Sequence, residues 1–452
     1  MSDRLYKELS KYSEGNVYPF HMPGHKRNMN SLDMGDCALN DGRGFLNDAY
    51  KIDITEIDGF DNLHDAKGLI KEAEENAAKL YKSEETHFLV NGSSCGVLSA
   101  IFSVTNKGDK VIVARNCHKS VYNAIYLNEL NPIFIYPEDH NEEEIAASIY
   151  PKDIERAILE NRDAKAVIFT SPTYDGIISD VASICKIAHE FDIPVIVDEA
   201  HGALFYLEGR SAVINNADIV INSVHKTLPA LTGTALIHVN GKLVDRDNVK
   251  KYLSIFQTSS PSYVLMASID YAMEIMETKG IELYRNHCIK LFSLKESIKK
   301  LRLLKYFSRE DALVAGAFDF DESKVIISTA GTELTGKKLS DILLKEYGIQ
   351  CEMATKGYAL LMLTVMDSDE GIERLKKALL EIDDNIASGK YKEVKSENRE
   401  NTLKTFIGNK SDKTVYVYPP GIPIIIEGET VTQEVIDKID EALKAGLDVK
   451  GL

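Results

Sequence analysis

Residues 218–227 read DIVINSVHKT, a short apolar run that leads into Lys226. The β-branched residues predict a buried strand, and Lys226 follows its carboxyl end. That edge of the sheet is where α/β proteins build their binding sites. Partial burial there lowers the pKa of a lysine and frees its amine for a Schiff base. Taken alone, a lysine after a strand is more often a surface residue, so the neighbouring segments decide its meaning.

Similar apolar runs alternate with helical stretches on both sides of this strand. Strands are expected at 110–114, 132–136, 166–170, 194–197, 219–222 and 234–239, and helices at 65–82, 94–105, 119–129, 151–160, 179–191 and 265–305. This alternation predicts βαβ units, and therefore a large, mainly parallel sheet with helices on both faces. Residues 306–452 mix strands and helices again and predict a smaller α/β domain. We expect an N-terminal arm over 1–63, a large domain over 64–290 and a small C-terminal domain over 291–452.

A second strand end carries an acid and a histidine. Residues 194–201 read PVIVDEAH, so Asp198 closes the strand and His201 follows three residues later. A buried aspartate needs a partner, and a protonated pyridine nitrogen is one that fits. A helix cap by Asp198, or a metal site built from Asp198 and His201, explains the pattern equally well.

Two further strand-to-helix junctions carry polar residues. Ser93, Ser94 and Cys95 lie at the N-terminus of an expected helix, whose first N–H groups and dipole favour an anion, although an ordinary N-cap uses the same residue types. His118 lies at the next junction and can stack on a planar ring. With Ser223 and His225 beside Lys226, the junctions describe a phosphate cradle, a ring stacker, an acid and a reactive lysine. Together these are the parts of a pyridoxal 5′-phosphate (PLP) site.

The composition excludes several other classes of protein. Of 452 residues, 53 are Lys or Arg and 70 are Asp or Glu, which gives a net charge of −17 and argues against a nucleic-acid partner. Apolar runs fall short of the roughly 18 residues of a spanning helix, so no membrane partner is expected. The N-terminus has no apolar signal core and the six cysteines are scattered, which predicts a cytoplasmic protein without disulfides or a metal site.

Longer motifs carry a family resemblance. They are FHMPGHK at 20–26, DITEIDGFDNLH at 53–64, SVHK at 223–226, QTSSPSY at 257–263 and YPPGIP at 418–423. With these motifs the chain resembles the Orn/Lys/Arg decarboxylase group of fold-type-I PLP-dependent enzymes, and in particular the short branch that lacks an N-terminal wing. The resemblance implies the fold-type-I PLP-dependent transferase fold.

The resemblance also implies roles for individual residues. Lys226 is then the Schiff-base lysine, Asp198 pairs with the pyridine nitrogen and His118 stacks on the ring. The remaining cofactor contacts are expected from Ser93, Ser94, Cys95, His201, Ser223, His225 and, from a neighbouring subunit, Ser259 and Ser260. The implied assembly is a homodimer with shared active sites.

The implied reaction is PLP-dependent decarboxylation of a basic amino acid to an amine and CO2. Arginine and lysine rank above ornithine as the substrate. A cationic side chain needs acids at the far end of the pocket, and the candidates are Glu56, Asp58, Asp61, Glu352 and Glu427. The alternatives are an aminotransferase or lyase of the same fold, or a catalytically silent regulatory partner.

Overall fold

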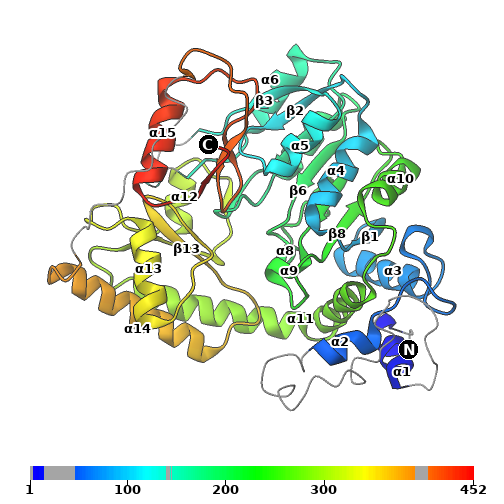
Figure 1. Cartoon of the computed structure of the whole chain (residues 1–452), viewed down its shortest axis with the longest axis horizontal. Helices are drawn as coiled ribbons and strands as arrows, with labels where there is room; N and C mark the ends of the chain where they lie inside the picture. Colours follow the sequence, from blue (N-terminus) through cyan, green and yellow to red (C-terminus); the bar gives the residue numbers. More distant parts are fainter. Residues whose placement is uncertain (1–3, 15–45, 139–142, 144, 392–405) are drawn as a thin grey trace, which may run out of the picture.

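The structure is a computed structural model that describes residues 4–14, 46–138, 143, 145–391 and 406–452 (Figure 1). The FHMPGHK motif at 20–26 lies outside the described residues. Within the part of the chain that is described, none of the helices has the length and apolar character that a membrane crossing requires.

A seven-stranded sheet forms the centre of the fold. Its strand order is β1-β8-β7-β6-β4-β2-β3. The strands are β1 (Glu85–Leu89), β2 (Lys110–Ala114), β3 (Asn131–Ile135), β4 (Val167–Thr170), β6 (Val195–Asp198), β7 (Ile219–Asn222) and β8 (Ala235–Val239). The pairs from β3 to β7 are parallel, and β8 pairs antiparallel with both β7 and β1. The predicted α/β fold with a large, mainly parallel sheet is therefore confirmed.

The helices that follow these strands are packed in two apolar cores. One core joins the sheet to α4 (Gly92–Val104), α5 (Lys119–Leu127), α6 (Pro151–Glu160), α7 (Val181–His189) and α10 (Arg246–Phe256). The second core joins β1 to α1 (Leu5–Glu14), α3 (Leu69–Tyr81) and α11 (Tyr263–Ile298). The helix α2 (Leu46–Ile52) lies beside α1 and α11. Single turns α8 (Phe205–Glu208) and α9 (Val224–Thr227) complete this part of the chain.

The start of α3 differs from the predicted helix at 65–82. A separate turn, η4 (Leu63–Asp65), is capped by Asn62, and α3 begins only at Leu69. The reason is Asp61, whose carboxylate accepts N–H groups from Lys67 at 2.9 Å and from Gly68 at 2.7 Å. These bonds hold the chain in a turn where the apolar spacing indicated a helix.

The C-terminal part forms two smaller antiparallel sheets. The first has the order β12-β13-β11-β9 and packs on α13 (Gly336–Tyr347) and α14 (Asp369–Ala387). Its strands are β9 (Lys305–Tyr306), β11 (Lys324–Ser328), β12 (Met353–Ala354) and β13 (Tyr358–Met362). The second has the order β15-β14-β16 and packs on α15 (Gln433–Lys444), with β14 (Val415–Val417), β15 (Pro423–Ile425) and β16 (Val449–Lys450). The predicted domain limit between 290 and 291 falls inside the continuous helix α11, and it stays a prediction.

Two contacts bring the C-terminal part to the main sheet. The short strand β10 (Asp319–Phe320), which follows α12 (Arg309–Val314), pairs with β5 (Ile177–Ile178) from the segment after β4. The guanidinium of Arg115, just after β2, donates to the carbonyl of Pro423 at 2.9 Å. These contacts place the start of β11 and the segment 418–422 against the carboxyl edge of the large sheet.

Candidate active site

A cavity of about 400 Å³ opens at the carboxyl ends of β4, β6 and β7. Its wall includes the predicted site residues Ser93, Ser94, His118, Asp198, His201, His225 and Lys226. The opposite wall comes from the C-terminal part, with Glu352 and the segment 418–422. The structure therefore brings together residues from four strand-to-helix junctions that are far apart in the chain.

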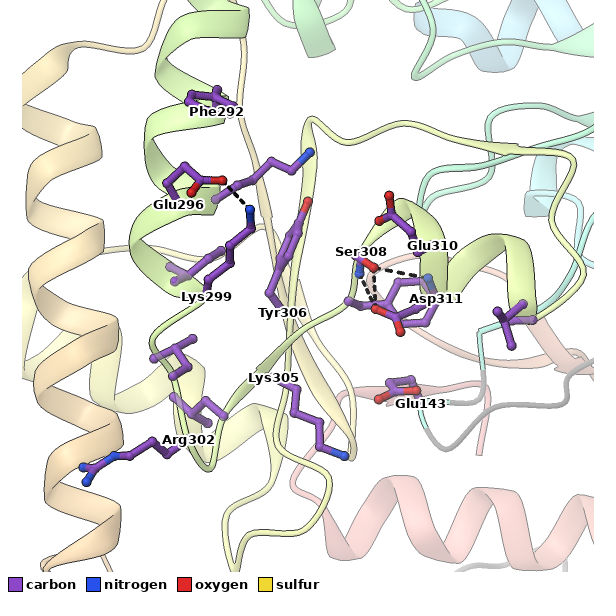
Figure 2. A pocket seen from close by; sticks show the side chains of 17 residues that line it. Glu143, Phe292, Glu296, Lys299, Arg302, Lys305, Tyr306, Ser308, Glu310 and Asp311 are labelled. Atoms are coloured by element: carbon purple, nitrogen blue, oxygen red, sulfur yellow. Dashed lines mark hydrogen bonds and ion pairs between the residues drawn. The ribbon is translucent and has the colours of Figure 1, made fainter.

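A larger cavity of about 980 Å³ lies between the end of α11 and α12, away from these residues (Figure 2). Its lining carries charges of both signs, and Glu296 is paired with Lys299 three residues later on the same side of the cavity. Ser308 and Asp311, on its other side, are bonded to each other as the cap of α12. Because the lining contains none of the predicted site residues, the smaller cavity is the candidate active site.

Lys226 and Asp198 face each other in the smaller cavity. The single turn α9 follows β7 directly and turns Lys226 towards the end of β6, where Asp198 is only 5% exposed. Burial lowers the pKa of Lys226, and the charge of Asp198 opposes this effect. Burial raises the pKa of Asp198, with Lys226 and the Ala200 N–H, at 3.1 Å, acting in the opposite direction. The pair supplies a nucleophilic amine beside a buried carboxyl group.

His118 is held in one orientation. It is the N-cap of α5, and its Nδ1 accepts the Ser120 N–H at 3.2 Å, so the ring carries its proton on Nε2. Burial lowers the pKa of His118 to about 4, with the charge of Lys226 acting in the same direction. Gly421 lies against the ring, because a Cβ at that position would sit 3.5 Å from the His118 Nε2. A neutral imidazole with a fixed plane therefore forms one wall of the cavity.

Four buried polar atoms around the cavity have no hydrogen-bond partner among the described residues. Asn116 Oδ1 and Thr170 Oγ1 belong to the cavity wall, and Ser223 Oγ and Thr227 Oγ1 flank Lys226 in the chain. Buried polar atoms are nearly always paired in proteins, so this set indicates a polar ligand.

The start of α4 adds a place for an anion. Ser93 and Ser94 lie in the first turn of this 13-residue helix, and Gly92 before them has φ +73° with open space where a Cβ would be. His225 donates its Nδ1–H to the carbonyl of Thr234 at 2.7 Å, which fixes its ring beside the same space. A helix N-terminus with unpaired hydroxyls nearby suits a phosphate group. The residues present therefore fit a planar, phosphorylated cofactor.

Other predicted residues lie outside the cavity lining. Cys95 packs in the core and donates its thiol to the carbonyl of Gly92 at 3.0 Å, and burial raises its pKa to about 12. Ser259 and Ser260 are exposed on the surface of the chain. Of these three, none touches the cavity of its own chain.

Of the acids predicted to bind a cationic side chain, one lines the cavity and the others do not. Glu352 lines the cavity, where it accepts a hydrogen bond from Tyr174. Asp61 caps the start of α3 instead, and Glu56, Asp58 and Glu427 are exposed away from the lining.

Two residues of the site were missed by the sequence analysis. Tyr174 packs edge-on against His201 with 4.6 Å between ring centres, and it is four residues past β4, where a strand-end signal existed. Lys324 opens β11, and its Nζ lies 2.7 Å from the Nδ1 of His201. Nothing in the sequence around Lys324 distinguishes it from other lysines that begin a strand.

Comparison with known proteins gives the site its context. The family described as "Orn/Lys/Arg decarboxylase, major domain" matches residues 4–316. An arginine decarboxylase of Bacillus subtilis is 34% identical over 471 residues, covering 99% of this chain and 95% of that protein. An arginine decarboxylase of Bacillus anthracis is 31% identical over 471 residues, with 99% and 94% covered. The crystal structure of the Francisella novicida lysine decarboxylase LdcF superimposes with a TM-score of 0.85 at 20% identity, over 100% of this chain and 79% of that one.

Proposed function

The chain belongs to the Orn/Lys/Arg decarboxylase family and is an amino-acid decarboxylase, and from this premise we propose that it decarboxylates arginine with PLP as its cofactor. Arginine ranks ahead of lysine because both relatives cited above that match the chain over almost its whole length are arginine decarboxylases. Lysine is the second candidate substrate, since "Lysine decarboxylase LdcA" of Pseudomonas aeruginosa is 25% identical over 60% of the chain.

The observation that carries this proposal is the cavity that joins Lys226, Asp198 and His118. Lys226 would hold the cofactor covalently, Asp198 would face its ring nitrogen and His118 its ring. Ser93, Ser94, Ser223, His225 and the first N–H groups of α4 would bind its phosphate. When bound, PLP supplies an electron sink for the pair released as the bond from Cα to the carboxylate breaks.

The remaining chemistry falls to side chains of the chain itself. Burial favours the neutral amine of Lys226, which is the form that can attack a carbonyl carbon. Loss of CO2 leaves Cα in need of a proton, and the groups placed to deliver one are Lys226 and His201, whose nitrogens lie 3.0 Å apart. The segment 418–422 also lines the cavity, and its apolar rings would limit the access of water to a bound substrate.

Glu352 is the acid we assign to the basic side chain of the substrate. Of the acids predicted to bind a cationic side chain, it is the one that lines the cavity, and its partner Tyr174 holds its carboxylate on that side. We expect Glu352→Gln to raise the KM for arginine about tenfold, the value of one lost charge contact of about 1.4 kcal/mol. An equal KM in the variant and the wild type would contradict this assignment.

The site is also proposed to be shared between two copies of the chain. Ser259 and Ser260 are exposed and do not reach the cavity of their own chain, as expected if they face a partner. Chains with Lys226→Ala mixed with chains inactivated in the 257–263 segment should regain activity in mixed dimers. Mixed dimers that stay inactive would count against a shared site.

The function is tested directly with purified protein and added PLP. The wild type should show the visible absorbance of bound cofactor and should convert arginine to agmatine and CO2 faster than lysine or ornithine. Lys226→Ala should lose both properties, whereas Lys376→Ala, which removes a lysine far from the cavity, should keep them. A protein that binds no PLP refutes the cofactor, and a cofactor-loaded protein that releases no CO2 from any of the three amino acids refutes the reaction.

A further inference from the structure

One imidazole connects two lysine amines at the candidate site. The Nε2 of His201 lies 3.0 Å from the Nζ of Lys226, and its Nδ1 lies 2.7 Å from the Nζ of Lys324. Lys324 is fully buried, and it comes from β11 in the C-terminal part of the chain. None of the described carboxylates lies in hydrogen-bond contact with its ammonium group, which is unusual for a buried lysine, so its place on this ring calls for a physical reason.

The ring between the two amines is neutral. Burial lowers the pKa of His201 well below its usual value, and the charges of Lys324 and Lys226 lower it further. A neutral imidazole has one N–H donor and one acceptor nitrogen. One lysine must therefore donate to the ring, while the other must accept from it. An amine that accepts a hydrogen bond uses its lone pair and so carries no charge.

The charges around Lys324 favour it as the donor. Burial and the charge of Lys226 lower the pKa of Lys324, to a net value of about 8, although the charges of Asp321, Glu352 and Asp175 act in the opposite direction. Its stem is also fixed, because a Cβ at Gly176, where φ is +99°, would meet the Lys324 Cγ at 2.8 Å. Lys324 is thus a confined group with three acids in its surroundings.

Fewer acids face Lys226. Asp198 and Glu352 favour its charge, against the effect of burial. His118 and His225 also face this region, and burial lowers the pKa of both. The ring of Tyr174 is 6.0 Å from the Lys226 Nζ and carries no charge there. The balance makes Lys226 the amine that accepts the Nε2–H of His201.

We propose that Lys324 is a positioning residue that acts through His201 to keep Lys226 a neutral, nucleophilic amine. An ammonium at Lys324 occupies the Nδ1 lone pair, which places the imidazole proton on Nε2. The Nε2–H then donates to Lys226 and stabilises its uncharged form. The benefit to catalysis rests on the proposed function, but the charge state of Lys226 is a property of the chain alone.

The test measures the ionisation of Lys226 in the full-length protein without added cofactor. Limiting acetic anhydride reacts only with neutral amines, and mass spectrometry of peptides gives the labelling of Lys226 between about pH 6 and pH 10. Lys324→Met should raise the labelling pKa of Lys226 by about one unit, because a nearby positive charge and the fixed imidazole tautomer are both lost. At a pH below the pKa of Lys226 in both proteins, the labelling rate of Lys226 should be about tenfold lower in Lys324→Met than in the wild type.

Two further variants separate the parts of the argument. Lys324→Arg keeps a charged donor to Nδ1 and should restore the wild-type labelling pKa. His201→Phe keeps an aromatic ring beside Tyr174 but removes the bond to Lys226, so it should raise the pKa of Lys226 even though Lys324 is present. An effect of Lys324 through space alone would leave this pKa unchanged. Lys376→Met, which removes another buried lysine outside the site, is the matched control.

The proposal is overturned if Lys324→Met leaves the labelling pKa of Lys226 within about 0.3 unit of the wild type. It is also overturned if His201→Phe has no effect. If Lys324→Met does not fold, as judged by its thermal unfolding, the comparison of His201→Phe with Lys324→Arg decides the question. The labelling requires neither PLP nor substrate, so a wrong assignment of the reaction would leave this result standing.

Discussion

Arg115 holds one wall of the cavity in place, and its removal has a predictable consequence. Its guanidinium donates to Glu429 at 3.0 Å and 3.2 Å and to the carbonyl of Pro423 at 2.9 Å. Its side chain is 11% exposed, against 27% for Glu429. These contacts fix the strand β15, which directly follows the cavity segment 418–422. Arg115→Met keeps most of the apolar stem but removes every one of these donors.

The loss of stability expected for Arg115→Met lies between the values for a buried and an exposed ion pair. Removal of one partner from a fully buried ion pair costs about 3–5 kcal/mol, whereas an exposed pair contributes about 0.2–1 kcal/mol. Glu429 is partly exposed, and it keeps the N–H of Ile426 at 3.0 Å. We therefore expect a loss of about 2 kcal/mol in the local stability of the segment. This loss corresponds to a fraction of molecules with the segment locally unfolded that is about thirtyfold larger.

Hydrogen–deuterium exchange measures this population. Peptides over 415–425 should exchange about thirtyfold faster in Arg115→Met, while peptides over β6 should not change. The KM of the enzyme should rise because the cavity wall is less ordered. Arg374→Met is the matched control, since Arg374 pairs with Glu370 at the surface and its loss should change exchange less than about fivefold.

Unchanged exchange over 415–425 in Arg115→Met would refute this reasoning. A double-mutant cycle with Glu429→Gln gives a second check. If the two substitutions have additive effects, then the pair does not carry the stability assigned to it.

Three other outcomes are expected. Asp198→Asn removes a charge without changing the volume of the side chain. It should lower kcat about a thousandfold at saturating PLP, which corresponds to the loss of a charge contact of about 4 kcal/mol. An unchanged kcat would be incompatible with pairing of Asp198 to the cofactor. Burial alone would lower the pKa of His87, but Glu74 and Glu85 raise it to about 9. The stability contributed by the charged imidazole is therefore fully present below about pH 6.5 and is lost as the pH rises through 9. In urea unfolding, His87→Gln should therefore flatten the dependence of stability on pH over this range, by up to about 3 kcal/mol, and parallel curves would contradict the ion pairs. Gly336→Ala should destabilise the protein by about 2 kcal/mol or more, because its Cβ would lie 1.9 Å from a backbone oxygen, and an unchanged unfolding midpoint would show that the contact relaxes freely.

Several elements were predictable to the residue, and the reason is their burial. The strands at 110–114 and 219–222 and the helix at 151–160 have the predicted limits. Parallel strands covered on both faces need continuous apolar runs, and short β-branched runs bounded by turn residues are readily recognised in a sequence. The strand β1 was missed because its first three residues are polar, and it forms through antiparallel pairing with β8.

Two of the polar side chains of β1 have partners in distant parts of the chain, in addition to the contact between Glu85 and His87 themselves. Glu85 pairs with Lys250, and His87 lies 3.3 Å from Glu74. Tertiary contacts of this kind override local preference, and no window of neighbouring residues contains them.

The sequence by itself determined the parallel part of the sheet and the three central residues of the candidate site, Lys226, Asp198 and His118. Each lies at or just after the carboxyl end of a parallel strand of the large sheet. The carboxyl ends of parallel strands meet at one edge, so spacing along the chain becomes proximity in space. The tertiary structure alone decided the opposite wall. Lys324 is 123 residues from His201 in the chain, and the two meet only because a separate antiparallel sheet packs against that edge. The packing of two sheets depends on side-chain contacts across the whole interface, which no local pattern in the sequence records.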